Sequence, residues 1–121
     1  MKRRFRLSRS NDIQRVRRVG KSYAHPLLVL VASPAQSSPT RVAIVTGRRI
    51  GFAVQRNRAK RQIRACFDKL LPDLAEGWHL VVLARQPIVG ADYAEIDQVL
   101  KSVLRRAGLT VEIKAENGRN P

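Results

Sequence analysis

Three short aliphatic runs limit what this chain can fold into, because each has the length and composition of a β-strand. They cover residues 27–32, 41–46 and 79–84. A continuous apolar run of this length is typical of a strand buried on both faces. None is long enough to span a bilayer as a helix. Residues 33–40 contain two prolines and three serines, and this loop composition predicts that the first two runs pair as an antiparallel hairpin.

Helical patterns alternate with these runs. Ile13 and Val16 recur at helical spacing behind Ser10, which has the side chain of an N-cap residue, and together they predict a helix over residues 10–19. The longest helical pattern covers residues 54–71. The order of the elements begins as helix, strand, strand, helix.

A third strand and a third helix complete the order. The helix is introduced by Asp92 and Glu95, spaced as a capping box, and ends at Gly108. Residues 109–113 predict a further short strand, and residues 115–121 are expected to be a disordered tail.

One domain is expected over residues 1–114. The chain has 121 residues, of which 44% are hydrophobic, and this is enough for one compact core. The order of elements predicts an α+β fold, a single two-layer domain in which helices pack on a small mixed sheet.

The charge of the chain is extreme and unevenly distributed. Twenty-four Lys and Arg residues against nine acids give a net charge of +15. Residues 1–64 hold 17 of these bases and one acid, whereas residues 65–121 hold 7 bases and 8 acids. A surface built only for solubility mixes the two signs. The distribution therefore indicates a polyanionic partner, either nucleic acid or an acidic membrane face.

The longest helical pattern carries much of this charge. At about 100° per residue its apolar side chains fall on one side, which is expected to face the core. These side chains are Ala59, Ile63, Cys66, Phe67 and Leu70. The adjoining polar arc consists of Arg56, Asn57, Arg58, Lys60, Arg61 and Arg64. Like charges at four-residue spacing and cations near a helix N-terminus both destabilise a helix, so a merely solvated face is disfavoured and an anionic ligand is favoured.

Signals for self-sufficient catalysis or metal binding are lacking in the sequence. Cys66 is the single cysteine, and the two histidines, His25 and His79, have no partner at metal-ligand spacing. There is no phosphate-binding Gly-rich loop, zinc signature or nucleophile elbow. The basic N-terminus lacks the apolar stretch of a secretory signal, although an Arg-rich transit peptide shares its composition. A reducing, cytoplasmic setting is expected.

Residues 48–64, Arg-Arg-Ile-Gly-Phe-Ala-Val-Gln-Arg-Asn-Arg-Ala-Lys-Arg-Gln-Ile-Arg, resemble the signature of the bacterial ribonuclease P protein subunit. That signature is a basic pair, a Gly, Ala-Val, one variable residue, Arg-Asn-Arg, another variable residue, Lys-Arg and a further Arg, and every position matches. The likeness in charge, length and order of elements extends over residues 3–108. It implies the family fold, in which a left-handed crossover joins parallel strands around the central helix.

The resemblance also implies a function. Members of the family bind a catalytic RNA that removes the 5′ leader of precursor tRNA in a Mg²⁺-dependent hydrolysis, so this chain is expected to act as the accessory subunit of that endoribonuclease without catalytic residues of its own. Mg²⁺ would be held mainly by the RNA and the substrate, with no metal site on the protein. A complex of one protein with one RNA and no membrane partner is expected.

The RNA-binding residues implied by the match are Arg48, Arg49, Arg56, Asn57, Arg58, Lys60, Arg61 and Arg64. A cleft between the motif helix and the sheet would hold the single-stranded leader. The residues assigned to leader binding are Ile13, Val16, Tyr23 and Phe52. Of these, Tyr23 and Phe52 flank basic segments and could stack on unpaired bases.

The chain departs from the family pattern in its first helix. Family members carry Phe, two residues, then Val-Phe, where this chain has Ile13, Val16 and Arg17. Two other classes of protein share part of the signal. A ribosomal-type structural RNA binder would explain charge and size but not the spaced motif, and a basic membrane-surface protein would need an apolar face beside the basic one.

Overall fold

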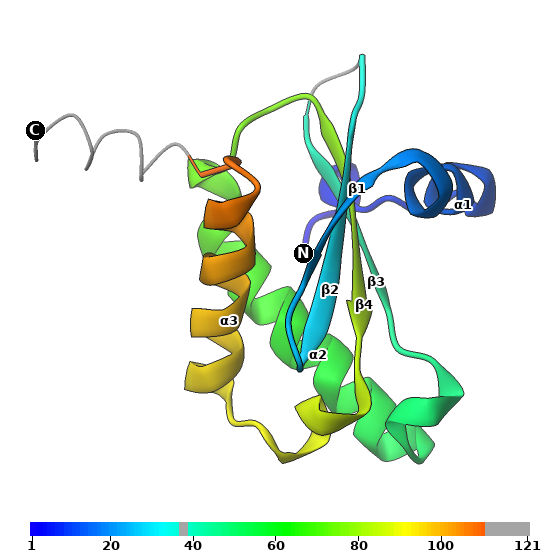
Figure 1. Ribbon diagram of the computed structural model, residues 1–121, viewed down its shortest axis with the longest axis vertical. Helices are drawn as coiled ribbons and strands as arrows, with labels where there is room; N and C mark the ends of the chain where they lie inside the picture. Colours follow the sequence, from blue (N-terminus) through cyan, green and yellow to red (C-terminus); the bar gives the residue numbers. More distant parts are fainter. Residues whose placement is uncertain (37–38, 111–121) are drawn as a thin grey trace, which may run out of the picture.

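The computed structural model describes residues 1–36 and 39–110. Its helices are α1 (Ser10–Val19), α2 (Ala53–Leu70) and α3 (Tyr93–Arg106), its strands are β1 (Lys21–Ala24), β2 (Leu28–Pro34), β3 (Arg41–Val45) and β4 (Trp78–Ala84), and its 3-10 turns are η1 (Arg3–Phe5), η2 (Arg48–Ile50), η3 (Leu71–Asp73) and η4 (Gln86–Gly90). The predicted α+β class is confirmed, with helices on a small mixed sheet (Figure 1).

The four strands form one sheet in the order β1-β2-β4-β3. β2 is antiparallel to both β1 and β4, whereas β3 is parallel to β4. The predicted hairpin between residues 27–32 and 41–46 is therefore wrong, because β4 lies between these strands. β4 is one of the two inner strands, where Leu80 and Val82 are completely buried, at 0% exposure each. Burial of apolar side chains thus outweighs the proximity of β2 and β3 in the sequence.

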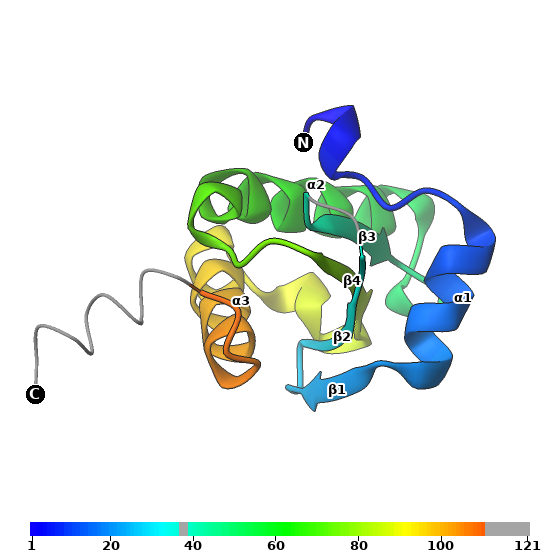
Figure 2. The ribbon, with the colours of Figure 1, turned by 90° about the horizontal axis from the view of Figure 1, so that it is seen from above.

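The connection from β3 through α2 to β4 has an unusual hand. Figures 1 and 2 together show that this crossover is left-handed, as the family resemblance implies. Parallel neighbours joined in this way are right-handed in most proteins.

The main core lies between the sheet and the pair α2 and α3, which cover the same face (Figure 1). The inward side of α2 is buried as its helical periodicity predicts, with Ile63, Cys66 and Phe67 at 0% exposure. α3 contributes Ile96, Leu100 and Leu104 to the same core. The side chain of Asp92 accepts a hydrogen bond from the backbone N–H of Glu95 at 2.9 Å, which confirms the capping contact at the start of α3.

The opposite face of the sheet is covered by α1 and the N-terminal segment (Figure 2). The predicted two-layer arrangement is therefore wrong, because helices pack on both faces of the sheet. Val16 of α1 packs with Val31, Ala43 and Val81 in a second, smaller core. The N-terminal segment extends this layer to the edge of the sheet, because the backbone N–H of Leu7 donates to the carbonyl of Val42 at 2.9 Å. That contact occupies the outer edge of β3.

Three further predictions concern the ends of elements. The N-cap of α1 is Arg9 and not Ser10, which is the first residue of the helix. The strand β1 was not predicted, because its four residues, Lys-Ser-Tyr-Ala, are too few and show no apolar alternation. Thr110 forms an isolated antiparallel bridge with Leu74, and the rest of the predicted strand 109–113 and the predicted tail 115–121 lie outside the described residues. Within the described ranges, every helix is too short or too polar to cross a membrane.

Candidate nucleic-acid interface

The turn that introduces α2 depends on a glycine. Gly51 has φ +145°, a backbone conformation that side chains disfavour, and a Cβ at this position would collide with the side chain of Gln55. The same Gln55 side chain accepts a hydrogen bond from the backbone N–H of Phe52 at 2.8 Å. The guanidinium of Arg56 donates to the carbonyl of Gly51 at 2.7 Å. The motif thus fixes the direction in which α2 leaves the sheet.

The polar arc of α2 faces away from the core. Asn57, Arg58 and Arg61 are exposed, and Arg56, Lys60 and Arg64 are half-buried. On the opposite, inner side of the helix, Ala59 is 2% exposed and Ile63 is 0% exposed. The two predicted RNA-binding residues that lie outside the helix are Arg48 and Arg49. Both are exposed on η2, immediately before α2. The structure therefore brings the eight predicted RNA-binding residues onto one connected segment.

No carboxylate neutralises this segment within the described part of the chain. The ion pairs there join the N-terminal amine of Met1 to Asp68, and both Lys69 and Lys101 to Asp97. The cations of η2 and of the polar arc of α2 take part in none of them. Guanidinium groups without an internal partner are well suited to phosphate, because their planar N–H groups can donate in pairs to its oxygens.

A second candidate surface lies on the α1 side of the sheet. Val29, Val45 and Leu83 share a face with the buried residues beneath α1 but are only half-buried, because α1 does not reach them. Ile13 of α1 is half-buried against the same small core. We call these four residues the apolar floor.

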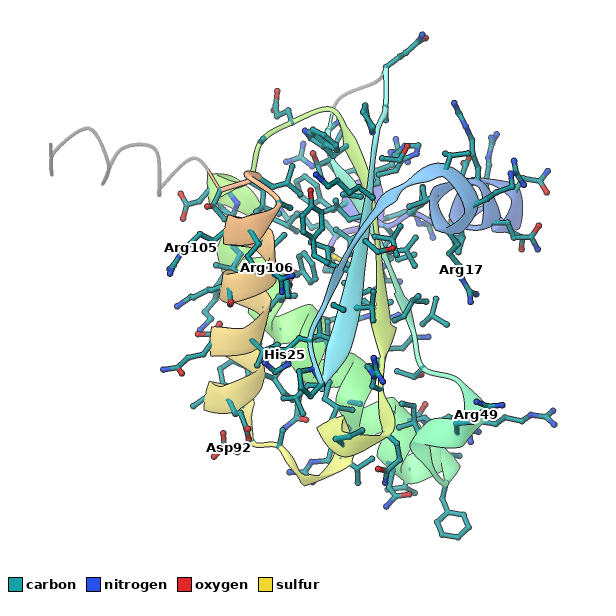
Figure 3. The ribbon with its side chains drawn as sticks, in the orientation of Figure 1. Arg17, His25, Arg49, Asp92, Arg105 and Arg106 are labelled. Atoms are coloured by element: carbon teal, nitrogen blue, oxygen red, sulfur yellow. The ribbon has the colours of Figure 1, made fainter. Side chains whose placement is uncertain are left out.

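Two arginines flank the apolar floor. Figure 3 shows Arg17 on α1 and Arg49 on η2, next to the start of α2, both on the side of the sheet away from α3. Both side chains are exposed. An apolar strip between cations fits single-stranded nucleic acid, since bases pack on the strip while phosphates meet the cations.

The four residues predicted to bind the leader are not brought together. Ile13 belongs to the apolar floor, but Val16 is 2% exposed and supports α1 from below. Tyr23 pairs in register with Leu30 and packs against the main core, on the opposite face of the sheet. Phe52 projects from the N-terminus of α2 at 82% exposure.

The predicted cleft between α2 and the sheet is wrong. The inner side of α2 is packed without exposure against the main core, so a strand of RNA cannot enter there. The open part of the sheet is on the α1 side. Sequence reasoning missed Val29, Val45 and Leu83 because a continuous aliphatic run does not reveal which of its faces is covered. It named Arg17 only as a departure from the family pattern.

The remaining candidate groups are structural. Burial, together with a smaller contribution from the nearby Asp97 carboxylate, raises the pKa of the Cys66 thiol to about 11. The thiol is therefore protonated at neutral pH and is not a nucleophile. The Nδ1 atom of His25 accepts a hydrogen bond from the backbone N–H of Leu27 at 3.1 Å. Among the described residues no group of His, Cys, Asp and Glu could hold a metal ion.

Comparisons with known proteins agree on one family. The family model for ribonuclease P matches residues 1–108. The ribonuclease P protein component of Chloroflexus aurantiacus is 37% identical over 110 residues, which cover 90% of this chain and 82% of that protein. The same component of Geobacillus kaustophilus is 37% identical over 109 residues, covering 89% and 90%.

Solved structures support the same assignment. The RNase P protein of Staphylococcus aureus superposes with a TM-score of 0.81 at 28% identity, covering 88% of this chain and 97% of that one. That of Thermotoga maritima superposes with a TM-score of 0.76 at 26% identity, covering 84% and 96%. With its signature helix, its mixed sheet and these matches over most of its length, the chain belongs to the ribonuclease P protein family.

Proposed function

We propose that this chain is the protein subunit of ribonuclease P, which binds the catalytic RNA and the 5′ leader of precursor tRNA and assists Mg²⁺-dependent removal of the leader. The observation that carries the proposal is the basic arc of α2, held in a fixed direction by the turn at Gly51 and lacking carboxylate partners in the described structure. The reacting groups belong to the RNA and its bound metal ions.

The α2 arc docks on the catalytic RNA. Its exposed guanidinium groups, those of Arg58 and Arg61, donate to phosphate oxygens, and the side chain of Asn57 between them donates and accepts hydrogen bonds with sugar, base or phosphate. The repulsion among neighbouring cations on the free helix is relieved by the RNA. This contact positions the protein and is strongly dependent on salt concentration.

The leader of the precursor lies over the apolar floor. Its bases pack on Ile13 and the three strand residues, and its phosphates contact Arg17 and Arg49. Phe52, exposed at the start of α2, stacks on an unpaired base near Arg49. Val16 supports α1, and Tyr23 takes no part because it faces the main core.

The protein aids metal binding without ligating a metal. Its cations reduce the repulsion between the phosphates of the substrate and those of the catalytic RNA, so that Mg²⁺ held by the two RNAs binds at lower concentration. One protein binds one catalytic RNA, in the cytoplasm.

Two alternatives make different predictions. A ribosomal-type structural RNA binder would bind RNA without affecting the cleavage of precursor tRNA. A membrane-surface protein would need an apolar face next to the basic one. The apolar side of α2 is buried in the main core, which counts against this second alternative.

Reconstitution tests the proposal. The purified chain should not cleave precursor tRNA by itself, and it should accelerate cleavage by a bacterial ribonuclease P RNA at low Mg²⁺ concentration. Arg61→Glu combined with Arg64→Glu should weaken binding of the RNA and flatten its dependence on salt. The control is Arg105→Glu, at an exposed arginine of α3, which should leave binding unchanged. Cleavage without RNA, or no acceleration with it, would contradict the proposed function.

A further inference from the structure

A small polar pocket lies on the α1 side of the sheet, where the N-terminal segment, α1, β3 and β4 meet. It has a volume of about 240 Å³. Its lining consists of Arg6, Leu7, Ser8, Arg9, Asp12, Arg41 and His79. These residues come from three separate parts of the chain, residues 6–12, β3 and β4, so that only the folded domain assembles the pocket.

The pocket concentrates positive charge. Three guanidinium groups, those of Arg6, Arg9 and Arg41, line it with the single carboxylate of Asp12, which leaves a formal charge of +2. The ion pairs of the described chain involve Asp68 and Asp97 only, so Asp12 does not neutralise any of the three. The side-chain Nε of Arg6 donates to the carbonyl of Met1 at 3.2 Å, and its remaining N–H groups are available to a ligand.

Among the residues that line the pocket, Arg41 gives the clearest evidence for an anionic ligand. It begins β3, stands in register with His79 of β4, and is half-buried. Within the described residues its guanidinium has no ion pair and no hydrogen bond. Among the described residues, no side-chain nitrogen of Arg41 is both buried and unpartnered, so the guanidinium is accessible to an anion in the pocket.

We propose that this pocket binds one phosphate group of an RNA backbone. Arg6, Arg9 and Arg41 supply charged donors, and the hydroxyl of Ser8 and the imidazole of His79 supply two more. The volume is large enough for a phosphate group together with bound water. The Asp12 carboxylate opposes a second negative group, which limits the site to one phosphate.

The pocket and the apolar floor lie on the same face of the sheet and mark the two ends of one path for a nucleic-acid strand. His79 and Leu83 lie on the same face of β4, four residues and therefore about 13 Å apart. The buried residue between them, Val81, marks the line along which α1 crosses the sheet. A phosphate in the pocket belongs either to the leader, continued past α1, or to the catalytic RNA. Both are phosphodiesters, and the identification of these two RNAs rests on the proposed function.

The first test uses inorganic phosphate and the full chain. Phosphate is titrated at constant ionic strength while the backbone amide resonances of Arg41 and His79 are followed by NMR. We expect saturable shifts, and an affinity that falls about tenfold in Arg41→Gln and in Arg9→Gln, because each variant loses a charge-assisted hydrogen bond. Arg9 is exposed, so the second variant remains informative if the first does not fold. The control is Arg105→Gln on α3, which should change the affinity less than about twofold.

Absence of saturable shifts, or an equal loss of affinity in the control, would overturn the proposal. Phosphate binding by the isolated chain does not depend on cleavage. A chain that binds phosphate but fails to accelerate the RNA would therefore count against the proposed function and not against an anion site.

The second test identifies the source of the phosphate. The same variants are assembled with catalytic RNA, and affinities are measured for the catalytic RNA, for precursor tRNA and for mature tRNA without a leader. A loss confined to precursor tRNA assigns the site to the leader, and a loss for the catalytic RNA assigns it to that RNA. If Arg9→Gln and Arg41→Gln weaken neither complex more than Arg105→Gln does, the pocket does not bind an RNA phosphate.

Discussion

Lys60→Gln should stabilise the free protein and weaken its binding to RNA. Lys60 stands at the centre of α2, four residues from Arg56 and four from Arg64, with no carboxylate partner in the described structure. Each like-charge pair at this spacing destabilises a helix by about 0.2–0.5 kcal/mol. Removal of one charge abolishes two such pairs, so the free energy of unfolding should rise by about 0.4–1 kcal/mol. Equilibrium unfolding in urea at low salt measures it.

The same change removes one cation from the RNA interface. If Lys60 contacts one phosphate, the slope of the logarithm of the binding constant against that of the salt concentration should become shallower by about 0.7–0.9. Stability and affinity then move in opposite directions. A residue retained for folding alone cannot produce this result.

Lys101→Gln is the matched control. Lys101 is exposed on α3 and its Nζ lies 3.0 Å from the Oδ2 of Asp97 four residues earlier, a favourable pair. The same substitution should therefore lower the free energy of unfolding by about 0.3–0.5 kcal/mol and leave the salt slope unchanged. If Lys60→Gln destabilises the protein as Lys101→Gln does, or leaves the salt slope as it was, the interpretation of the α2 arc as an RNA-binding face is refuted.

Three further predictions test the turn, the core and the apolar floor. Gly51→Ala should destabilise the protein by about 1–3 kcal/mol in urea, because its φ is +145°, while Gly90→Ala, which meets open space, should be near neutral. As pH rises from 9 to 11 the folded chain, with its raised Cys66 pKa, should lose about 2 kcal/mol more stability than Cys66→Ala, because the unfolded thiol ionises first; parallel curves would contradict the shift. Arg17→Phe should make affinity for precursor tRNA less dependent on salt and more dependent on the leader bases, whereas an unchanged affinity would exclude Arg17 from leader contact.

The helices were largely predictable because their signals are local. The core side of α2, from Ala59 to Leu70, follows from a period of 3.6 residues, and the structure buries it as expected. The start of α3 follows from the spacing of Asp92 and Glu95. Both patterns act within a few residues of the chain, where one sequence carries the whole signal.

The pairing of the strands was not predictable in the same way. β2 and β3 are separated by a short loop, yet each pairs with β4, which follows them by more than thirty residues. Three aliphatic runs of similar composition give no indication of which takes the central place. The hand of the crossover came from the family resemblance, because general statistics favour the other hand.

The candidate site likewise has one part that local sequence signals predict and another part that they do not. The basic arc of α2 is a property of one helix, and its residues could be named from the motif. The apolar floor and the phosphate pocket are properties of the assembled sheet, because Val45 and Leu83, or Arg41 and His79, meet only when β3 and β4 pair. A sequence pattern that treats each strand separately cannot bring these side chains together.

The basic half of the chain, residues 1–64, depends on residues 65–121 for its folded geometry. β3 and the turn that directs α2 are held by β4, and β4 lies beyond residue 64, in the half that carries almost no net charge. The inner side of α2 is completed by α3, which also follows that boundary. A fragment of residues 1–64 would keep all of the net positive charge but would lack the strand and the helix on which its RNA-binding residues are arranged. The charge therefore supplies attraction to RNA, while the nearly neutral half determines the geometry in which that charge is presented.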